Sequence, residues 1–112
     1  MISMRYHIVS LAAVFLALLD PGDEVIVFEP FYENYGPDAI LAGAIPTFVP
    51  LERPHWTIDP DRLKKAFTKR TKALVLNTPH NPTGRVMTRA EMTMIAMITM
   101  WKLRLTVGIA PK

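Results

Sequence analysis

Two short segments of the chain gather residues that suit the binding of a planar ligand. Asn77–Gly84 reads Asn-Thr-Pro-His-Asn-Pro-Thr-Gly, and its prolines and terminal glycine predict a rigid loop that holds an amide side chain at a set position. Glu29–Tyr35 reads Glu-Pro-Phe-Tyr-Glu-Asn-Tyr, and its rings offer surfaces on which such a ligand can stack. Taken singly, these residues are more typical of a turn and of core or rim packing. Only the Asn77–Gly84 octapeptide as a whole favours a binding loop.

The composition is that of a folded globular chain. Half of the 112 residues are hydrophobic and 21% are charged, with ten prolines placed singly between apolar runs. The absence of cysteine excludes disulfides, thiolate nucleophiles and cysteine-ligated zinc, and we expect no metal site. The densest cationic stretch, Lys64–Lys72, has no interleaved aromatic residue. It therefore predicts a solvated helix face rather than a nucleic-acid surface.

Two apolar stretches raise the question of a membrane or a secretory signal. Ile8–Leu19 has about 12 residues, too few to span a bilayer. It is followed by Asp20–Asp23 rather than by a small-residue cleavage site, so a buried helix is favoured over a signal peptide. The second stretch, Met92–Ile109, is interrupted by Lys102 and Arg104. We expect a soluble, cytoplasmic protein without membrane contact, and a secreted or membrane-tethered protein is the disfavoured alternative.

Apolar runs that alternate with helical patterns predict a mostly parallel, doubly wound α/β sheet, which is a three-layer αβα arrangement. Pro46 restricts its strand to a sheet edge or to a position near the strand start, and Gly43 is suited to the end of a helix. Thr88 and Glu91 have the spacing of a capping box. The expected strands are 24–28, 45–49, 73–76 and 103–107; the expected helices are 8–19, 32–42, 60–67 and 88–100.

The Asn77–Gly84 octapeptide resembles the cofactor loop of class I/II aminotransferases, the fold-type I enzymes that use pyridoxal 5'-phosphate (PLP). Leu18–Val25 and Glu29–Tyr35 are similar to the same family in the same order and spacing. Within the family, the sequences of these motifs are most similar to those of the kynurenine and glutamine–phenylpyruvate aminotransferases. The resemblance covers residues 11–96, so residues 1–112 are expected to form one partial domain, a piece of the family's large domain with atypical ends at 1–10 and 97–112.

The resemblance implies roles for three residues in binding PLP. Tyr32 matches the aromatic residue that stacks on the pyridine ring, and Asn81 matches the asparagine that donates a hydrogen bond to the phenolic oxygen of the cofactor. Tyr35 is expected in the pocket wall. The resemblance also implies cis peptide bonds at Asn81-Pro82 and Glu29-Pro30.

His80 and Arg85, which lie near Asn81 in the sequence, are assigned no role in binding PLP. A lone histidine in a loop is typically solvated, so His80 is expected to be exposed. Arg85 follows the glycine of the loop and is expected to be a surface cation rather than a phosphate ligand.

The sequence departs from the family's pattern at the reacting centre. It contains no Ser-x-Ser-Lys segment for the lysine that forms the Schiff base with PLP, and it lacks the aspartate and arginine that pair with the pyridine nitrogen and the substrate carboxylate. Tyr6–Val9 lacks the Gly-rich turn that the family places there to hold the phosphate. We therefore assign no catalytic residue and expect the chain alone to be inactive.

Two functions remain open at this point. By resemblance, the chain belongs to an enzyme that transfers an amino group from an amino acid to a 2-oxo acid, and the intact family forms homodimers. The alternative is a non-catalytic remnant or binding module with this fold. Unpaired strand edges and uncovered apolar helix faces predict that the chain self-associates.

Overall fold

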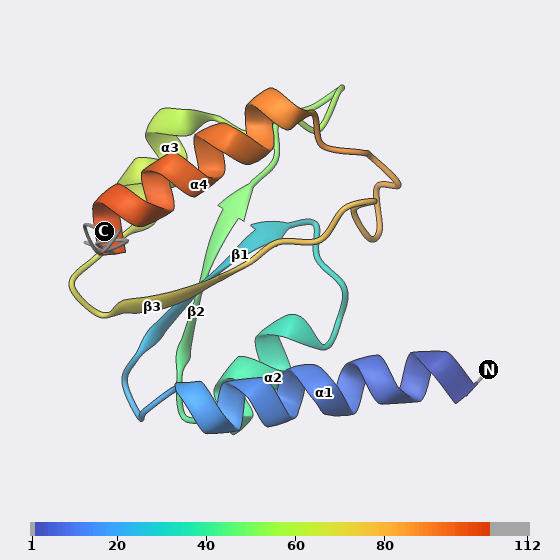
Figure 1. The fold of residues 1–112 in the computed structure, drawn as a ribbon, viewed down its shortest axis with the longest axis vertical. Coiled ribbons are helices and arrows are strands. Elements are labelled where there is room, and N and C mark those ends of the chain that lie inside the picture. Colours follow the sequence, from blue (N-terminus) through green and yellow to red (C-terminus); the bar gives the residue numbers. More distant parts are fainter. Residues whose placement is uncertain (1, 104–112) are drawn as a thin grey trace, which may run out of the picture.

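Helices and strands alternate along the chain in the computed structural model, which describes residues 2–103 and the side chains from Val9 onward (Figure 1). No helix in this part of the chain is long and apolar enough to cross a membrane. The elements are α1 (Ile2–Leu18), β1 (Glu24–Glu29), α2 (Tyr35–Leu41), β2 (Ile45–Pro50), α3 (Pro60–Ala66), β3 (Thr71–Val75) and α4 (Arg89–Leu103).

Within residues 2–103 the sheet has three parallel strands in the order β2-β1-β3. β1 is the central strand, and its Val25 lies opposite Pro46 of β2 and Ala73 of β3. Pro46 is the second residue of β2, which lies at an edge of this sheet, so both conditions for a proline in a strand are met. The predicted parallel α/β sheet is confirmed.

β1 is apolar from Val25 to Phe28 because helices cover both faces of the sheet. Val25 and Val27 pack in a cluster with residues of α1 and α2, such as Phe15. Ile26 and Phe28 pack on the opposite face with residues of α3 and α4. None of these four β1 side chains is more than 3% exposed. Figure 1 shows the resulting layers, with α1 and α2 on one side of the sheet and α3 and α4 on the other. The three-layer prediction is confirmed.

Side chains cap the amino ends of α3 and α4, and the capping box predicted for Thr88 and Glu91 is confirmed. The Asp59 carboxylate accepts hydrogen bonds from the backbone N–H groups of Asp61 and Arg62 and so caps α3. Before α4, the Thr88 hydroxyl accepts from the Glu91 N–H while the Glu91 carboxylate accepts from the Thr88 N–H, a reciprocal capping box.

Several predicted boundaries are wrong. α1 begins at Ile2 rather than at residue 8. α2 begins at Tyr35 rather than at residue 32, because the preceding residues form a turn in which the Tyr35 N–H donates to the Tyr32 carbonyl. β3 spans 71–75 rather than 73–76. α4 continues to Leu103, which packs against the core, so the strand predicted for 103–107 is wrong at its first residue. Its other residues lie outside the described part of the chain.

Candidate functional site

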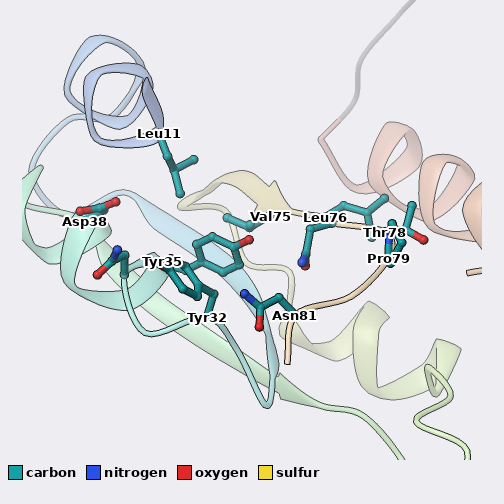
Figure 2. Close-up of a pocket in the computed structure, with 11 residues that line it drawn as sticks. Leu11, Tyr32, Tyr35, Asp38, Val75, Leu76, Thr78, Pro79 and Asn81 are labelled. Atoms are coloured by element: carbon teal, nitrogen blue, oxygen red, sulfur yellow. The ribbon is translucent and has the colours of Figure 1, made fainter. Parts of the chain in front are cut away.

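A pocket of about 650 Å³ lies at the carboxyl ends of β1 and β3. Tyr32 follows β1 and Asn81 follows β3, and these strands are parallel neighbours, so their loops leave the sheet at the same edge. The three residues assigned from the sequence, Tyr32, Tyr35 and Asn81, all line this pocket (Figure 2). The rest of the lining comprises Leu11, Asn34, Asp38 and the segment Val75–Pro79.

The two tyrosines form an aromatic corner in this pocket. Their ring centroids are 5.8 Å apart and their planes meet at 67°, an edge-to-face contact. Partial burial raises the pKa of the Tyr35 phenol, and the neighbouring Tyr32 raises it further. Tyr35 therefore keeps its proton at neutral pH. The corner combines an aromatic ring with a neutral phenol that can donate or accept a hydrogen bond.

His80 is buried at 3% exposure, so the prediction that it is exposed is wrong. Its N–H donates to the Arg85 carbonyl at 2.7 Å, and its carbonyl accepts from the Gly84 N–H at 2.6 Å. Its ring Nδ1 lies 2.8 Å from the Thr83 hydroxyl. Burial lowers the pKa of the ring, and the positive charge of Arg85 lowers it further. His80 is a neutral internal support of the Asn77–Gly84 loop.

Arg85 is an anchor of the loop, and the prediction of a surface cation is wrong. Its Nη2 lies 2.6 Å from Oε1 of Glu91, and the two side chains are only 19% and 18% exposed. The contact links the end of the Asn77–Gly84 loop to the first turn of α4. At the other end of the loop, the Thr78 hydroxyl accepts a hydrogen bond from the Met87 N–H at 3.0 Å.

The prolines of the two site loops adopt the predicted geometry. The Glu29-Pro30 and Asn81-Pro82 peptide bonds are both cis. The Arg53-Pro54 and Thr78-Pro79 bonds are also cis, which the sequence reasoning missed. Between Pro79 and Pro82 the chain turns so that Asn81 faces the space beside Tyr32 and Tyr35 (Figure 2).

Asp38 is a pocket residue that sequence reasoning missed. It lies three positions after Tyr35 on α2, a spacing that brings two side chains to one helix face, and this signal could have found it. Its Oδ2 is buried and has no hydrogen-bond partner among the described residues. It gives this end of the pocket a negative charge, which favours cations and disfavours phosphate.

The lining fits one part of PLP better than the other. The aromatic corner and the Asn81 amide suit a pyridine ring that carries an oxygen substituent. The described lining holds no Lys, Arg or His side chain that could pair with a phosphate or form a covalent bond through an amine. The fit is therefore to the ring. A phosphate would have to lie away from Asp38 and be held by groups outside this lining.

The lysines in the described part of the chain lie away from the pocket. Lys64 and Lys65 are on α3, which covers a face of the sheet. Lys72 is near the amino end of β3, opposite to the edge where the pocket opens, and Lys69 and Lys102 line a separate cavity beside that end. The arrangement can bind and orient a planar ligand, and the described residues bring no amine to it.

Comparison with known proteins identifies the family. The sequence profile described as aminotransferase class I and II matches residues 6–107. Kynurenine–oxoglutarate transaminase 3 of Mus musculus is 49% identical over 89 residues, which are 70% of this chain and 20% of that protein. Kynurenine–oxoglutarate transaminase 1 of Homo sapiens is 44% identical over 100 residues, which are 80% of this chain and 24% of that protein. The chain thus spans about a fifth to a quarter of the relatives it matches.

Solved structures agree with this match. The aspartate aminotransferase of Thermus thermophilus superposes with a TM-score of 0.81 at 38% identity, covering 84% of this chain and 25% of that one. The N-succinyldiaminopimelate aminotransferase of Mycobacterium tuberculosis gives 0.79 at 44% identity, covering 82% and 24%. The family uses PLP. With the profile covering most of its length, this chain belongs to the class I and II aminotransferase family.

Proposed function

We propose that this chain forms one wall of the cofactor pocket of a PLP-dependent aminotransferase. The observation that carries the proposal is the meeting of Tyr32 and Asn81 in one pocket, from loops that follow neighbouring parallel strands. The family match over residues 6–107 supports the same function. When bound, PLP supplies the electron sink through which amino groups are exchanged.

Each pocket residue has a distinct task in this proposal. The Tyr32 ring stacks on the planar ring of the cofactor and fixes its tilt. The Asn81 side-chain N–H donates to the oxygen on that ring, a contact that favours the ionised oxygen. The Tyr35 phenol, protonated at neutral pH, closes the wall behind Tyr32 and excludes water. Together these residues orient the ring without reacting with it.

The proposal extends to the substrates, the location and the oligomeric state of a complete enzyme. The relatives' names specify kynurenine and oxoglutarate, so an amino acid and a 2-oxo acid are the proposed substrate classes for a complete enzyme. A cytoplasmic location and a homodimeric complete enzyme are proposed with them. No role in nucleic-acid binding is proposed.

A non-catalytic binding module is the second candidate function. It is favoured by the described pocket lining, which holds a ring-binding corner but no lysine. In this case the chain binds PLP reversibly through Tyr32 and Asn81 and does not turn over amino acids. Both candidates share the binding step, and they differ in whether an amine reaches the ligand.

The experiment that tests the binding step is a calorimetric titration of the chain with PLP. We expect Asn81→Ala to weaken binding about tenfold, because one hydrogen bond to a charged oxygen contributes about 1.5 kcal/mol. Trp101→Ala is the control, since Trp101 is 69% exposed on α4 and does not line the pocket. Equal affinities of Asn81→Ala and the unmodified chain would contradict the proposal.

A second measurement tests whether an amine of this chain reaches the ligand. After incubation with PLP and reduction with borohydride, mass spectrometry reports whether any lysine carries the ligand. Both candidates predict an unmodified isolated chain and no transaminase turnover, because the described pocket lining holds no lysine. A single labelled lysine would contradict the binding-module candidate and the expectation that this chain alone is inactive.

A further inference from the structure

The Asp38 carboxylate is the single charged group in the described lining of the pocket at the carboxyl ends of β1 and β3. The other described lining residues are apolar, carry amides or a hydroxyl, or are the two tyrosines. Oδ2 of Asp38 is buried and accepts no hydrogen bond from the described residues. A buried carboxylate oxygen without a donor is costly. This end of the pocket therefore suits a ligand group that brings positive charge and N–H donors.

Two aromatic rings line the pocket beside this carboxylate. Tyr35 and Asp38 are three positions apart on α2, so they occupy neighbouring positions of one helix face. The Tyr32 ring meets the Tyr35 ring edge to face, with centroids 5.8 Å apart. In the view of Figure 2 both rings lie between Asp38 and Asn81. An aromatic face attracts an ammonium ion through its quadrupole and a carboxylate attracts it through its charge, so the two kinds of group act together.

The rest of the pocket suits an uncharged aromatic ring. Its volume of about 650 Å³ is typical of sites for small organic ligands. Leu11, Val75 and Leu76 add apolar surface to the lining. The Asn81 amide can donate a hydrogen bond to an oxygen substituent on the ring. A ligand that carries an oxygen-substituted ring and an ammonium group on a short chain therefore matches both the apolar surface and the carboxylate.

The lining as a whole defines the class of ligand. We propose that this pocket binds an arylalkylammonium ion, with the ammonium group at Asp38 and the ring against Tyr32 and Tyr35. This binding function requires no PLP, so it goes beyond the proposed function. Because both ligands use Tyr32 and Asn81, the chain binds one of them at a time.

Other classes of ligand fit this pocket less well. A metal ion needs several ligands, and within the described residues no three His, Cys, Asp or Glu side chains come together to hold one. An anion would meet the charge of Asp38, and the described lining holds no Lys, Arg or His side chain to offset the repulsion. A neutral ring would leave the buried carboxylate oxygen without a donor. The organic cation is the class that satisfies both the rings and the carboxylate.

The test is a calorimetric titration of the full chain with three ligands that share one phenol ring. Tyramine carries an ammonium group, 4-ethylphenol carries no charge, and 3-(4-hydroxyphenyl)propionate carries a carboxylate. We expect tyramine to bind at least about tenfold more tightly than 4-ethylphenol, because it adds a charge-assisted contact with Asp38. The propionate should bind most weakly. Equal affinities for the three ligands, tighter binding of the propionate or no binding of tyramine would each overturn the proposal.

A charge-removing substitution tests the role of Asp38 directly. Asp38→Asn should lower the affinity for tyramine about tenfold, to that for 4-ethylphenol, and should leave the affinity for 4-ethylphenol unchanged. Asp61→Asn is the matched control, because it removes the same charge from a side chain that is 81% exposed on α3 and does not line the pocket. An unchanged affinity of Asp38→Asn for tyramine, or an equal loss in both variants, would overturn the proposal.

The outcomes for this proposal and for the proposed function can be told apart. If Asp38→Asn does not fold, which its thermal transition reports, the three-ligand series on the unmodified chain still decides between the outcomes. Binding of tyramine without binding of PLP would contradict the proposed function and support the arylalkylammonium site. Binding of PLP without binding of tyramine would overturn the arylalkylammonium site alone.

Discussion

Arg85 and Glu91 join the Asn77–Gly84 loop to α4 through a charge-assisted hydrogen bond of 2.6 Å between Nη2 and Oε1. The other oxygen of Glu91 accepts hydrogen bonds from the Thr88 N–H and hydroxyl. One carboxylate thus caps the helix and holds the end of the loop. Because the Arg85 carbonyl also accepts from the His80 N–H, the position of the segment around Asn81 depends on this contact.

Removing the charge of Glu91 should destabilise the fold. Glu91→Gln keeps an oxygen for the cap but leaves the guanidinium of Arg85 without its anion while only 19% exposed. We expect a loss of about 1–3 kcal/mol in the free energy of unfolding, measured by urea denaturation. Asp61→Asn is the control, since Asp61 is 81% exposed and 3.7 Å from Lys64. Its expected loss is under about 0.5 kcal/mol, and equal losses would contradict the prediction.

Glu91 should also contribute to acid sensitivity. Burial raises the pKa of its carboxyl, but hydrogen bonds from Arg85 and Thr88 outweigh burial and hold the pKa below its usual value. A carboxyl with a depressed pKa stabilises the fold fully above the unfolded value, about 4.5, and this stabilisation is lost as the pH falls through the folded value. Urea midpoints between pH 7 and pH 3 should fall less steeply for Glu91→Gln. Parallel profiles would exclude this role.

His80 should make stability pH-dependent at milder acidity. Its pKa is lowered by burial and by Arg85, so the folded chain holds it neutral while the unfolded chain protonates it near pH 6.5. The stabilisation is complete above pH 6.5 and is lost as the pH falls from there toward the folded pKa. His80→Gln should flatten the dependence of the melting temperature on pH in this range. His55→Gln is the control at an exposed position, and an equal flattening there would contradict the role of His80.

Removing a core side chain between the sheet and α3 should cost the free energy that is usual for a cavity. Leu63 of α3 is 0% exposed and belongs to the cluster that includes Ile26. Leu63→Ala is expected to lower the free energy of unfolding by about 2–5 kcal/mol. Leu41→Ala, at 68% exposure on α2, should change it by less than about 0.5 kcal/mol. Urea denaturation checks both, and similar losses would mean that α3 does not pack as described.

Patterns confined to a few neighbouring residues were predictable from the sequence. The run Val25–Phe28 is apolar at every position because both faces of β1 are buried, and this property can be read directly from the residue types. The Thr88–Glu91 capping box and the Asp59 cap are equally local. Because helices connect the predicted strands, the strands are parallel, and the loops that follow them are predicted to lie at the same edge of the sheet.

Residues whose environment depends on distant elements were not predictable in this way. His80 and Arg85 look like ordinary loop residues in the sequence, and their burial arises only because the loop folds onto the first turn of α4. Asp38 enters the pocket because α2 begins at Tyr35, which puts Asp38 about one helical turn further along the same helix face. Such contacts follow from tertiary packing, which the residue types alone do not specify.

Two glycines at element ends offer a matched test of backbone conformation. Gly22 and Gly43 have φ of +89° and +79°, and the Gly22 N–H donates to the Gly43 carbonyl at 3.0 Å. Both positions lie in the left-handed region, where a side chain costs about 1–2 kcal/mol. A Cβ at Gly22 would meet no atom within 4 Å, whereas a Cβ at Gly43 would lie 3.3 Å from the Cα of Pro21.

The substitution Gly43→Ala should therefore destabilise the chain more than Gly22→Ala. The backbone strain is common to both variants, so the difference in their free energies of unfolding isolates the contact with Pro21. Because that neighbour is backbone, it can move away only by shifting the turn that leads into β1. Urea denaturation of the two variants measures the difference. Equal losses would show that the turn shifts at no cost in free energy. A larger loss for Gly22→Ala would contradict the prediction.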